Sequence, residues 1–471
     1  MVVGEIAEPV DLLVVGGGPG GHAAALHGAR TGRDVMLVDR RGADGLGGIC
    51  LHHGCIPSKA LIEVAERATA AAAFEDAGLP AGDVTFDMAR FQAWKRQMVD
   101  DLRGGVEREL DRAGVRVVAG ALTFTRGTQA IVETSDGQAR FLEFASAVVA
   151  TGSRPVDLPD LPRDGVHVLD SADLLGLDVL PTSLLVVGAG CIGVELSTAC
   201  AKLGSRVTLV EADERVLPGL DAKLSRPVAA RLRTLGVEVL TGAEFASFDG
   251  ASALIRTPDG PTKVTVDKVV TAVGRRPNTD ALGLERAGIP IDGEGRIPVA
   301  ADRRATEFVA AIGDVTAGHA LAHKASAEAP VAVDALAGRP AVFAPETVPA
   351  VVFSDPEVAS AGLTAVAATA EGIDVGTATV PLTVSGRAAT MRASQDGFTE
   401  LVFTRGEGIV LGVHLVGPHA SELIGEGVLA IEMGAGVEDL ELTIHPHPTM
   451  GEQLAAAGRL AVRKAAAGDG G

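Results

Sequence analysis

The feature that most constrains the fold of this chain is a nucleotide-binding pattern that occurs twice. Each copy has an apolar run of strand type, three glycines in G-x-G-x-x-G spacing, a helical stretch, and a second apolar run that ends in an acidic residue. The glycines and the acid of the first copy are Gly16, Gly18, Gly21 and Asp39. Those of the second copy are Gly188, Gly190, Gly193 and Glu211.

Each element of the pattern has a physical reason. The first glycine allows a tight turn, the second lets the backbone approach a pyrophosphate, and the third lets the helix pack on the strand. The pyrophosphate lies at the helix N-terminus, where unpaired N–H groups and the helix dipole favour an anion. Two complete units predict an α/β protein with two doubly wound, Rossmann-like dinucleotide-binding domains. They suggest one bound flavin and one exchanging nicotinamide.

The residues around the second acid indicate which nicotinamide is used. Glu211 is followed by Asp213 and Glu214, and only Arg215 is basic. The 2′-phosphate of NADP would meet these carboxylates, so the sequence favours NAD.

A cysteine pair follows the first glycine motif. The segment 47–59 reads GGICLHHGCIPSK and contains Cys50 and Cys55, two of only four cysteines in the chain. Pro57 fits the first turn of a helix that starts at Cys55, and a helix N-terminus stabilises a thiolate. Lys59, one turn further, would add positive charge. A dithiol beside a nucleotide cofactor indicates electron transfer between the two.

Two other interpretations of the cysteines remain open from the residues alone. One is an inert disulfide, which a reducing compartment disfavours. The other is a metal site formed with His52 and His53, although so short a loop is poorly suited to surround a tetrahedral ion.

Length and charge limit the function further. A chain of 471 residues should divide into several domains. The net charge of −20 argues against nucleic acid and anionic membranes as partners. The first residues carry Glu5, Glu8 and Asp11 where a signal peptide needs basic residues, and no run of about 18 apolar residues occurs. We therefore expect a soluble, cytoplasmic protein.

The motif GGxCxxxxCIPSK with an upstream GxGxxG resembles the flavoprotein disulfide reductases. Further segments are similar to that family and together span about residues 10 to 458: ATGSRP at 150–155, GAGCIGVEL at 188–196, GRRPNT at 274–279, AIGDV at 311–315, LAHK at 321–324, DPEVASAGLT at 355–364 and HPHPTMGE at 445–452. Within the family, the last segment most resembles the dihydrolipoamide dehydrogenases.

The resemblance implies a role for each matching residue. Cys50 would exchange with the substrate, and Cys55 would be the thiol next to the flavin. Lys59 would lie near flavin N5 and pair with Glu195. The FAD contacts implied are Gly16, Gly18, Gly21, Asp39, Lys59, Gly152, Asp314 and Ala322. The NAD contacts implied are Gly188, Gly190, Gly193, Glu211 and Gly274.

The resemblance also implies that His447 is the general base, that Glu452 orients it, and that it serves the active site of the other subunit. The residues alone permit a plainer interpretation, because Thr449-x-x-Glu452 fits a helix capping box and His447 precedes Pro448 in a turn. A dithiol that must be deprotonated near pH 7 nevertheless needs a base such as histidine.

The segments divide into four expected parts. These are an FAD-binding domain with the redox dithiol at 1–152, an NAD-binding domain at 153–275, a central segment at 276–346 that completes the FAD site, and a C-terminal α+β dimerisation domain at 347–471. A base supplied by the partner requires a homodimer.

The activity implied is oxidation of protein-bound dihydrolipoamide to lipoamide, with reduction of NAD⁺ to NADH. The expected partner is the lipoyl domain of the acyltransferase in a 2-oxo acid dehydrogenase complex. The alternatives are a related NADH-dependent disulfide or quinone reductase with another substrate, and a flavin-bearing assembly subunit.

Four residues depart from the family pattern or stand at an unusual position. Ile49 replaces the usual threonine, which removes one hydroxyl contact to FAD phosphate. His52 and His53 replace Asn-Val beside the dithiol. Cys191 stands at the expected nicotinamide pocket, either as a small apolar filler or as an oxidisable gate.

Overall fold

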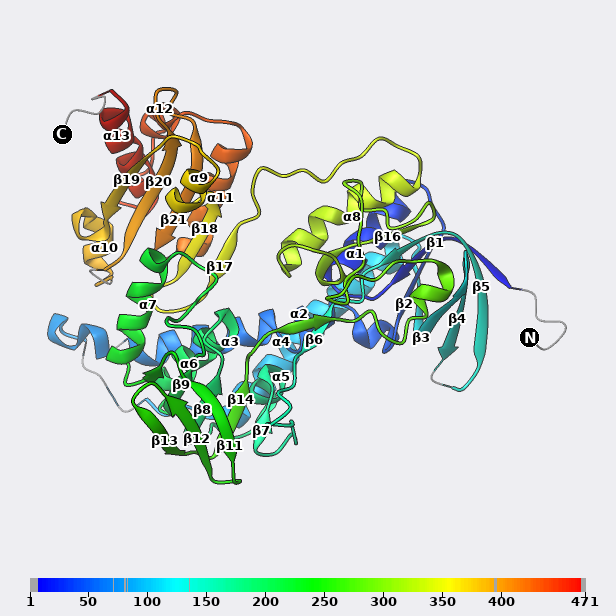
Figure 1. The fold of residues 1–471 in the computed structure, drawn as a ribbon, viewed down its shortest axis with the longest axis horizontal. Coiled ribbons are helices and arrows are strands. Elements are labelled where there is room, and N and C mark those ends of the chain that lie inside the picture. The colour runs from blue at the N-terminus through cyan, green and yellow to red at the C-terminus, as the bar shows by residue number, and fades with distance from the viewer. Residues whose placement is uncertain are drawn as a thin grey trace.

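The computed structural model describes residues 7–70, 72–79, 82, 84–134, 136–393 and 396–466. Figure 1 shows three sheet-centred parts, with the helices that carry the dithiol lying between the first and the second. The third part, near the C-terminus, is reached through an extended segment that follows α8 (Ala322–Leu336).

The first sheet is built around the first glycine motif. Its strands are β1 (Glu8–Val15), β2 (Val35–Asp39), β3 (Arg116–Arg126), β4 (Gln129–Thr134), β5 (Ala139–Val149) and β16 (Val309–Ala311). β1 pairs in parallel with β2 and β5, and β16 joins β5 from much later in the chain. β3, β4 and β5 are also linked as an antiparallel meander.

Helices cover one face of this sheet. α1 (Pro19–Arg30) packs against α8, and small side chains such as Ala24 and Ala329 are fully buried between them and the sheet. Residues 12–15 of β1 are buried on both faces, which explains why this end of the strand reads as a continuous apolar run.

The second sheet repeats the arrangement around the second glycine motif. It contains β7 (Val168–Leu169), β8 (Ser183–Val187), β9 (Arg206–Val210), β10 (Glu238–Leu240) and β14 (Lys268–Thr271), all parallel, in the order β10-β9-β8-β14-β7. Its helices include α5 (Ser171–Gly176), α6 (Cys191–Lys202) and α7 (Ala222–Thr234). An antiparallel sheet lies beside it: β11 (Glu244–Phe248), β12 (Ser252–Thr257) and β13 (Gly260–Thr265).

Two connections join the first part to the second. α3 (Cys55–Ala70), which follows the first glycine motif, packs against α6 of the second unit. The short strands β6 (Ser153–Pro155) and β15 (Arg275–Pro277) pair antiparallel, where the chain leaves one sheet and returns from the other. Both dinucleotide-binding units therefore meet at the dithiol.

The third part is an antiparallel sheet with helices. Its strands are β17 (Ala350–Val352), β18 (Val358–Gly362), β19 (Val375–Pro381), β20 (Phe398–Thr404) and β21 (Val410–Val416). Its helices are α9 (Ala365–Ala370), α10 (Gly386–Thr390), α11 (Ala420–Glu432), α12 (Val437–Leu442) and α13 (Glu452–Ala466). Large apolar side chains are exposed around α11 and α12, among them Met433 at 74% and Ile444 at 95%. An exposed apolar patch of this kind is typical of a subunit interface.

The remaining α-helices of the described residues are α2 (Gly48–His52) and α4 (Met88–Arg112). Among the described residues, no helix is both long and apolar enough to cross a membrane. The α/β fold class, with two parallel-sheet units of Rossmann type and a C-terminal α+β part, is confirmed.

Candidate active site

The dithiol loop lies directly on the first glycine motif. The Gly47 N–H donates to the Gly17 carbonyl over 2.8 Å. Gly48 has φ +59°, and a Cβ there would come within 2.7 Å of Gly18 Cα. Only glycine permits this approach, and it brings the cysteines to the point where a bound dinucleotide would cross the loop.

The two thiols are chemically unequal. Cys50 lies inside α2, and Cys55 is the first residue of α3; both are free thiols in this structure. A hydrogen bond from the Cys50 thiol, assisted by the charge of Lys59, lowers the pKa of Cys55 to about 7. The same hydrogen bond raises the pKa of Cys50. Cys55 is therefore the thiolate of the reduced pair, and Cys50 the thiol.

Lys59 is held by residues from the other two parts of the molecule. Its Nζ lies 2.8 Å from Glu195 Oε2, and Glu195 is 6% exposed on α6. The other oxygen, Oε1, accepts the Phe353 N–H over 3.0 Å. The ammonium also lies 4.4 Å from the centre of the Phe353 ring. The cation beside Cys55 thus has a fixed position.

The residues expected to bind FAD form a cradle that fits a dinucleotide. A Cβ on Gly16 would lie 2.4 Å from the Ala150 carbonyl oxygen, and one on Gly21 would lie 1.8 Å from that of Gly16. A Cβ on Gly18, by contrast, would meet no atom within 4 Å. The backbone is therefore packed below the loop and open above it, at the N-terminus of α1, where a pyrophosphate is favoured.

Asp39 lies beside this cradle at the end of β2. Its Oδ2 accepts the Gly17 N–H over 2.9 Å, and its Oδ1 accepts the Arg41 N–H over 2.9 Å. The carboxylate is therefore oriented next to the glycine loop, where the ribose of a dinucleotide would lie.

The remaining FAD residues come from later segments. Asp314 lies in a short turn after β16, and its Oδ2 accepts the Ser153 hydroxyl over 2.5 Å. Gly152, with φ +69°, precedes that serine, and Ala322 begins α8. The buried Glu328 fixes the turn, because its Oε2 accepts the Gly313 N–H over 2.7 Å.

The residues expected to bind NAD meet in one cavity. It has a volume of about 680 Å³, within the range of cofactor pockets, and its lining includes Gly188, Gly190, Glu211 and Gly274. Cys191, at the start of α6, also lines it. Gly193 lies below, where a Cβ would approach the Gly188 carbonyl oxygen to 1.9 Å, so it serves helix packing. These residues fit a dinucleotide.

Two backbone N–H groups fix the orientation of the Glu211 carboxylate in this cavity. Its Oε2 accepts the Ala189 N–H over 2.6 Å, and its Oε1 accepts the Asp213 N–H over 3.0 Å. The carboxylate lies at the rim of the glycine loop, where it can accept ribose hydroxyls and repel a 2′-phosphate.

His447 and Glu452 lie together in the third part of the molecule. His447 Nδ1 is 2.8 Å from Glu452 Oε1, and 82% of the histidine side chain is exposed. Glu452 Oε2 accepts the Thr449 N–H over 2.8 Å. One carboxylate oxygen of this glutamate therefore caps the start of α13, and the other orients the histidine. The histidine lowers the pKa of Glu452.

The structure does not bring His447 to the dithiol of its own chain. No hydrogen bond or ion pair in the described part of the chain joins His447 to Cys50 or Cys55. Its exposure next to the apolar patch of α11 and α12 suits a role toward another subunit.

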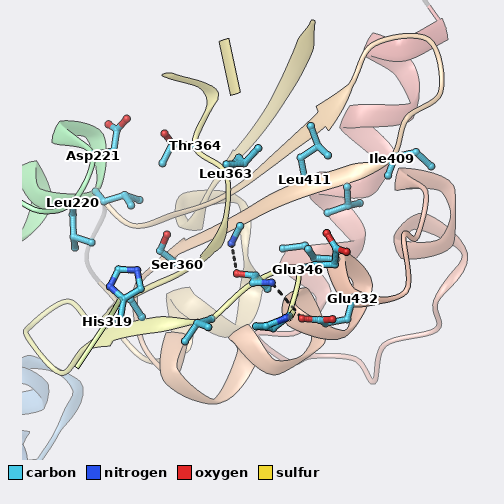
Figure 2. A pocket seen from close by; sticks show the side chains of 18 of the residues that line it. Leu220, Asp221, His319, Glu346, Ser360, Leu363, Thr364, Ile409, Leu411 and Glu432 are labelled. Atoms are coloured by element: carbon cyan, nitrogen blue, oxygen red, sulfur yellow. Dashed lines mark hydrogen bonds between the residues drawn. The ribbon is translucent and has the colours of Figure 1, made fainter. Parts of the chain in front are cut away.

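A second large cavity lies apart from these residues. Figure 2 shows Asp221, His319, Ser360 and Glu432 around it, between the segment before α7 and the C-terminal sheet. None of the predicted catalytic or cofactor-binding residues lines this cavity.

The residues that depart from the family pattern have simple surroundings. His52 Nε2 is 2.9 Å from the Leu46 carbonyl oxygen, and Ile49 is 45% exposed. Within the described ranges, no three His, Cys, Asp or Glu side chains are placed to hold a metal ion.

Sequence reasoning missed three residues of the site. Phe353 contacts Lys59 from the C-terminal part, and no local pattern marks it. Ser153 and Arg275 lie inside the segments ATGSRP and GRRPNT, whose resemblance to the family implies no role for these two side chains. The sequence signal that could have identified them is a polar side chain directly after a glycine, Gly152 or Gly274, that is itself expected to contact a cofactor.

Comparisons with known proteins agree with this site. Residues 10–329 match the model of the pyridine nucleotide-disulphide oxidoreductases, and residues 348–457 match the dimerisation domain of the same family. A dihydrolipoyl dehydrogenase of Geobacillus stearothermophilus is 43% identical over 459 residues, with 96% of each chain covered. Dihydrolipoyl dehydrogenase 2 of Haloarcula marismortui is 44% identical over 462 residues, with 96% of this chain and 97% of the relative covered.

Solved structures are similar over the same length. LpdA from Mycobacterium tuberculosis has a TM-score of 0.88 and 30% identity, and the HOCl-induced flavoprotein disulfide reductase RclA from Escherichia coli has a TM-score of 0.84 and 26% identity. Both comparisons cover 96% of this chain and 99% of the other. The chain thus belongs to the pyridine nucleotide-disulphide oxidoreductase family.

Proposed function

We propose that this protein is a dihydrolipoamide dehydrogenase, which oxidises protein-bound dihydrolipoamide to lipoamide and reduces NAD⁺ to NADH. The observation that carries the proposal is the unequal dithiol Cys50–Cys55, which lies between two dinucleotide-binding loops and beside a fixed cation. The relatives named dihydrolipoyl dehydrogenase, similar over nearly the full chain, support the substrate.

The cofactors are FAD and NAD. FAD is held by the first glycine loop, Asp39, Lys59, Gly152, Asp314 and Ala322. NAD is held by the second glycine loop, Glu211 and Gly274. A bound FAD would supply the two-electron chemistry that links the dithiol to hydride transfer to NAD⁺.

The chain's own residues carry out the thiol chemistry. The imidazole of His447, from the partner subunit and oriented by Glu452, takes a proton from a dihydrolipoamide thiol. The resulting thiolate attacks the Cys50 sulfur of the Cys50–Cys55 disulfide, forms a mixed disulfide and releases Cys55 as a thiolate. The second substrate thiol then displaces Cys50 and passes its proton to the Cys50 sulfur, so lipoamide leaves with Cys50 as a thiol and Cys55 as a thiolate. The first proton stays on His447 until it is released to solvent.

Lys59 and the N-terminus of α3 favour the thiolate that this exchange produces. With a pKa of about 7, Cys55 is about half ionised at pH 7, whereas Cys50, whose pKa is raised, remains protonated. The difference directs the substrate to one sulfur and the electrons to the other.

The proposal includes the division of the chain and its setting. The four parts are 1–152, 153–275, 276–346 and 347–471, and the working form is a cytoplasmic homodimer that serves the lipoyl domain of an acyltransferase. The match of 348–457 to a dimerisation domain and the exposed His447 support the dimer.

The decisive experiment is NAD⁺ reduction by dihydrolipoamide with FAD-loaded protein, beside a Cys50→Ser variant. We expect fast NADH formation that the variant loses, and no oxidation of NADPH by oxidised glutathione. Dye reduction by NADH without any dihydrolipoamide turnover would contradict the proposal and indicate a dithiol that serves another substrate.

A further inference from the structure

A cation in the wall of the NAD cavity is bonded to the carboxylate of the flavin site through one serine. Arg275 lines the cavity together with Gly188 and Glu211. Its Nε donates to Ser153 Oγ over 2.8 Å, and its Nη2 donates to the Ser153 carbonyl over 2.6 Å. Ser153 Oγ in turn lies 2.5 Å from Asp314 Oδ2.

The chemistry of the three groups sets the direction of each hydrogen bond. A guanidinium can only donate, and an ionised carboxylate can only accept. The Ser153 hydroxyl must therefore accept from Arg275 and donate its single proton to Asp314. Ser153 is 4% exposed, so water does not substitute readily for either partner.

The pairing of β6 with β15 places these residues. In the antiparallel register Arg275 is opposite Pro155 and Pro277 is opposite Ser153, so the long arginine side chain reaches diagonally to the serine. The next residue, Arg276, is exposed, and its guanidinium lies 3.6 Å from Asp280. Two adjacent arginines on one strand thus have different surroundings.

Arg275 can respond to the contents of the cavity. Its Nη1 makes no hydrogen bond to any residue that the structure describes, while Nε and Nη2 hold Ser153. Burial lowers the pKa of Arg275, and the nearby Asp314, Asp170 and Cys55 oppose that effect. The guanidinium is therefore partly desolvated, and its Nη1 can still donate hydrogen bonds. Such a group attracts an anionic pyrophosphate.

We propose that Arg275 and Ser153 are positioning residues that couple the two dinucleotide sites, so that occupancy of the NAD cavity changes the hydrogen bond that Ser153 gives to Asp314. The inference rests on the proposed binding of FAD at Asp314 and of NAD at the second glycine loop. An anion that accepts hydrogen bonds from Arg275 weakens the hydrogen bonds that Arg275 donates to Ser153. The Ser153 hydroxyl is then less firmly oriented, and its hydrogen bond to the Asp314 carboxylate changes. Because coupling is reciprocal, FAD alters the affinity of the NAD cavity by the same factor.

The test uses ADP-ribose, which carries the pyrophosphate but no nicotinamide and so cannot contact the flavin through that ring. FAD-free protein is titrated with FAD, with and without saturating ADP-ribose, and the visible flavin spectrum of the loaded protein is recorded in both states. In the parent protein we expect the FAD dissociation constant to change about fivefold or more, with a visible flavin difference spectrum.

Two variants and one control distinguish a specific loss of coupling between the two sites from a general loss of structure. Arg275→Met and Ser153→Ala should each bring the ratio of the FAD dissociation constants close to one and abolish the difference spectrum. Arg276→Met, which changes the neighbouring exposed arginine, should behave like the parent. Ser153→Ala removes only a hydroxyl and carries the test if thermal unfolding shows Arg275→Met to be misfolded.

The outcomes distinguish the two proposals. Normal turnover of dihydrolipoamide with no effect of ADP-ribose on FAD in the parent, or an effect that survives in both variants, overturns the coupling and leaves the proposed function intact. Failure of the parent to bind FAD overturns the proposed function and the coupling, which needs bound FAD, whereas failure only to oxidise dihydrolipoamide overturns the proposed function alone.

Discussion

Lys59 Nζ lies 2.8 Å from Glu195 Oε2, although 136 residues separate the two along the chain. The first residue belongs to the helix that begins at Cys55, and the second to the helix that follows the second glycine motif. Glu195 also accepts the Phe353 N–H. One buried carboxylate on the second part therefore holds Lys59 of the first part next to the dithiol and is itself bonded to the backbone of the third part.

Replacement of that cation should change the acidity of Cys55. Lys59→Met removes a positive charge that lowers the Cys55 pKa, so the pKa should rise above its present value of about 7, by about one unit. Thiolate then forms at higher pH, and alkylation of Cys55 at pH 7 should slow several-fold. The measurement is the pH dependence of iodoacetamide labelling in reduced, FAD-free protein, with Cys55 located by peptide mass mapping.

The matched variants make this test specific. Glu195→Gln removes a negative charge that raises the Cys55 pKa, so its labelling curve should move the opposite way. Glu63→Gln, on the exposed side of the same helix, should leave the curve in place. A shift of equal sign in Lys59→Met and Glu195→Gln would rule out electrostatic control by this ion pair.

The histidine of the C-terminal part should matter only for the thiol reaction. His447→Gln should slow dihydrolipoamide oxidation by roughly 10²–10⁴, the usual contribution of a general base. NADH-dependent dye reduction should stay unchanged, because it requires no deprotonation of a substrate thiol. Glu452→Gln should cause a smaller loss, and His419→Asn, at an exposed histidine before α11, should cause none. Equal losses in both assays would assign His447 a structural role.

Substitutions at two glycines of the first motif should affect different properties, FAD affinity for one and folding stability for the other. Gly18→Ala adds a Cβ with no atom within 4 Å, so the free energy of unfolding without FAD should change by no more than about 0.5 kcal/mol. The methyl group would meet the pyrophosphate, and FAD affinity should fall roughly tenfold or more, a loss of about 1.4 kcal/mol. Denaturant unfolding and FAD titration measure the two effects.

Gly21→Ala provides the contrast. Its Cβ would lie 1.8 Å from the Gly16 carbonyl oxygen, so the helix and the loop must separate. We expect a loss of about 1–3 kcal/mol or more in unfolding free energy before any cofactor is added. Equal stability of the two variants would contradict the division of roles between these glycines.

The choice of nicotinamide should depend on Glu211. Glu211→Gln removes the charge that opposes a 2′-phosphate and weakens the acceptor for ribose hydroxyls, by about 1.5–3 kcal/mol for a charged hydrogen bond. The kcat/KM for NAD⁺ should therefore fall tenfold or more, while the ratio of NADP⁺ to NAD⁺ use rises. Glu214→Gln, at an exposed neighbour outside the cavity lining, should leave kcat/KM for NAD⁺ unchanged and should raise the ratio less than Glu211→Gln does. Unchanged preference in Glu211→Gln would remove the basis for assigning NAD.

Local features of the site could be predicted because their causes are local. A helix does begin at Cys55, where Pro57 fits the first turn and the helix dipole favours a thiolate. The strands β8 and β9 run from Ser183 to Val187 and from Arg206 to Val210, as their apolar runs indicate. Turn geometry, apolar runs and glycine spacing all act within about thirty residues, so one sequence suffices to read them.

Contacts between distant segments could not be predicted in the same way. Phe353 lies over Lys59, and Arg275 reaches Asp314 through Ser153, only because separate sheets pack at one point and β6 pairs with β15 in one register. A shift of that register by one residue would turn Arg275 away from the cavity and bring Arg276 to it.

The sequence by itself determined the two dinucleotide-binding units, the dithiol, the NAD preference and the family to which the chain is similar, because each is encoded in a short run of residues with its own chemistry. The tertiary structure decided what holds Lys59, and that His447 lies exposed with Glu452 as its partner and no hydrogen bond to its own dithiol among the described residues. Those properties depend on distances between groups far apart in the chain, and only the packing of the three sheets sets such distances.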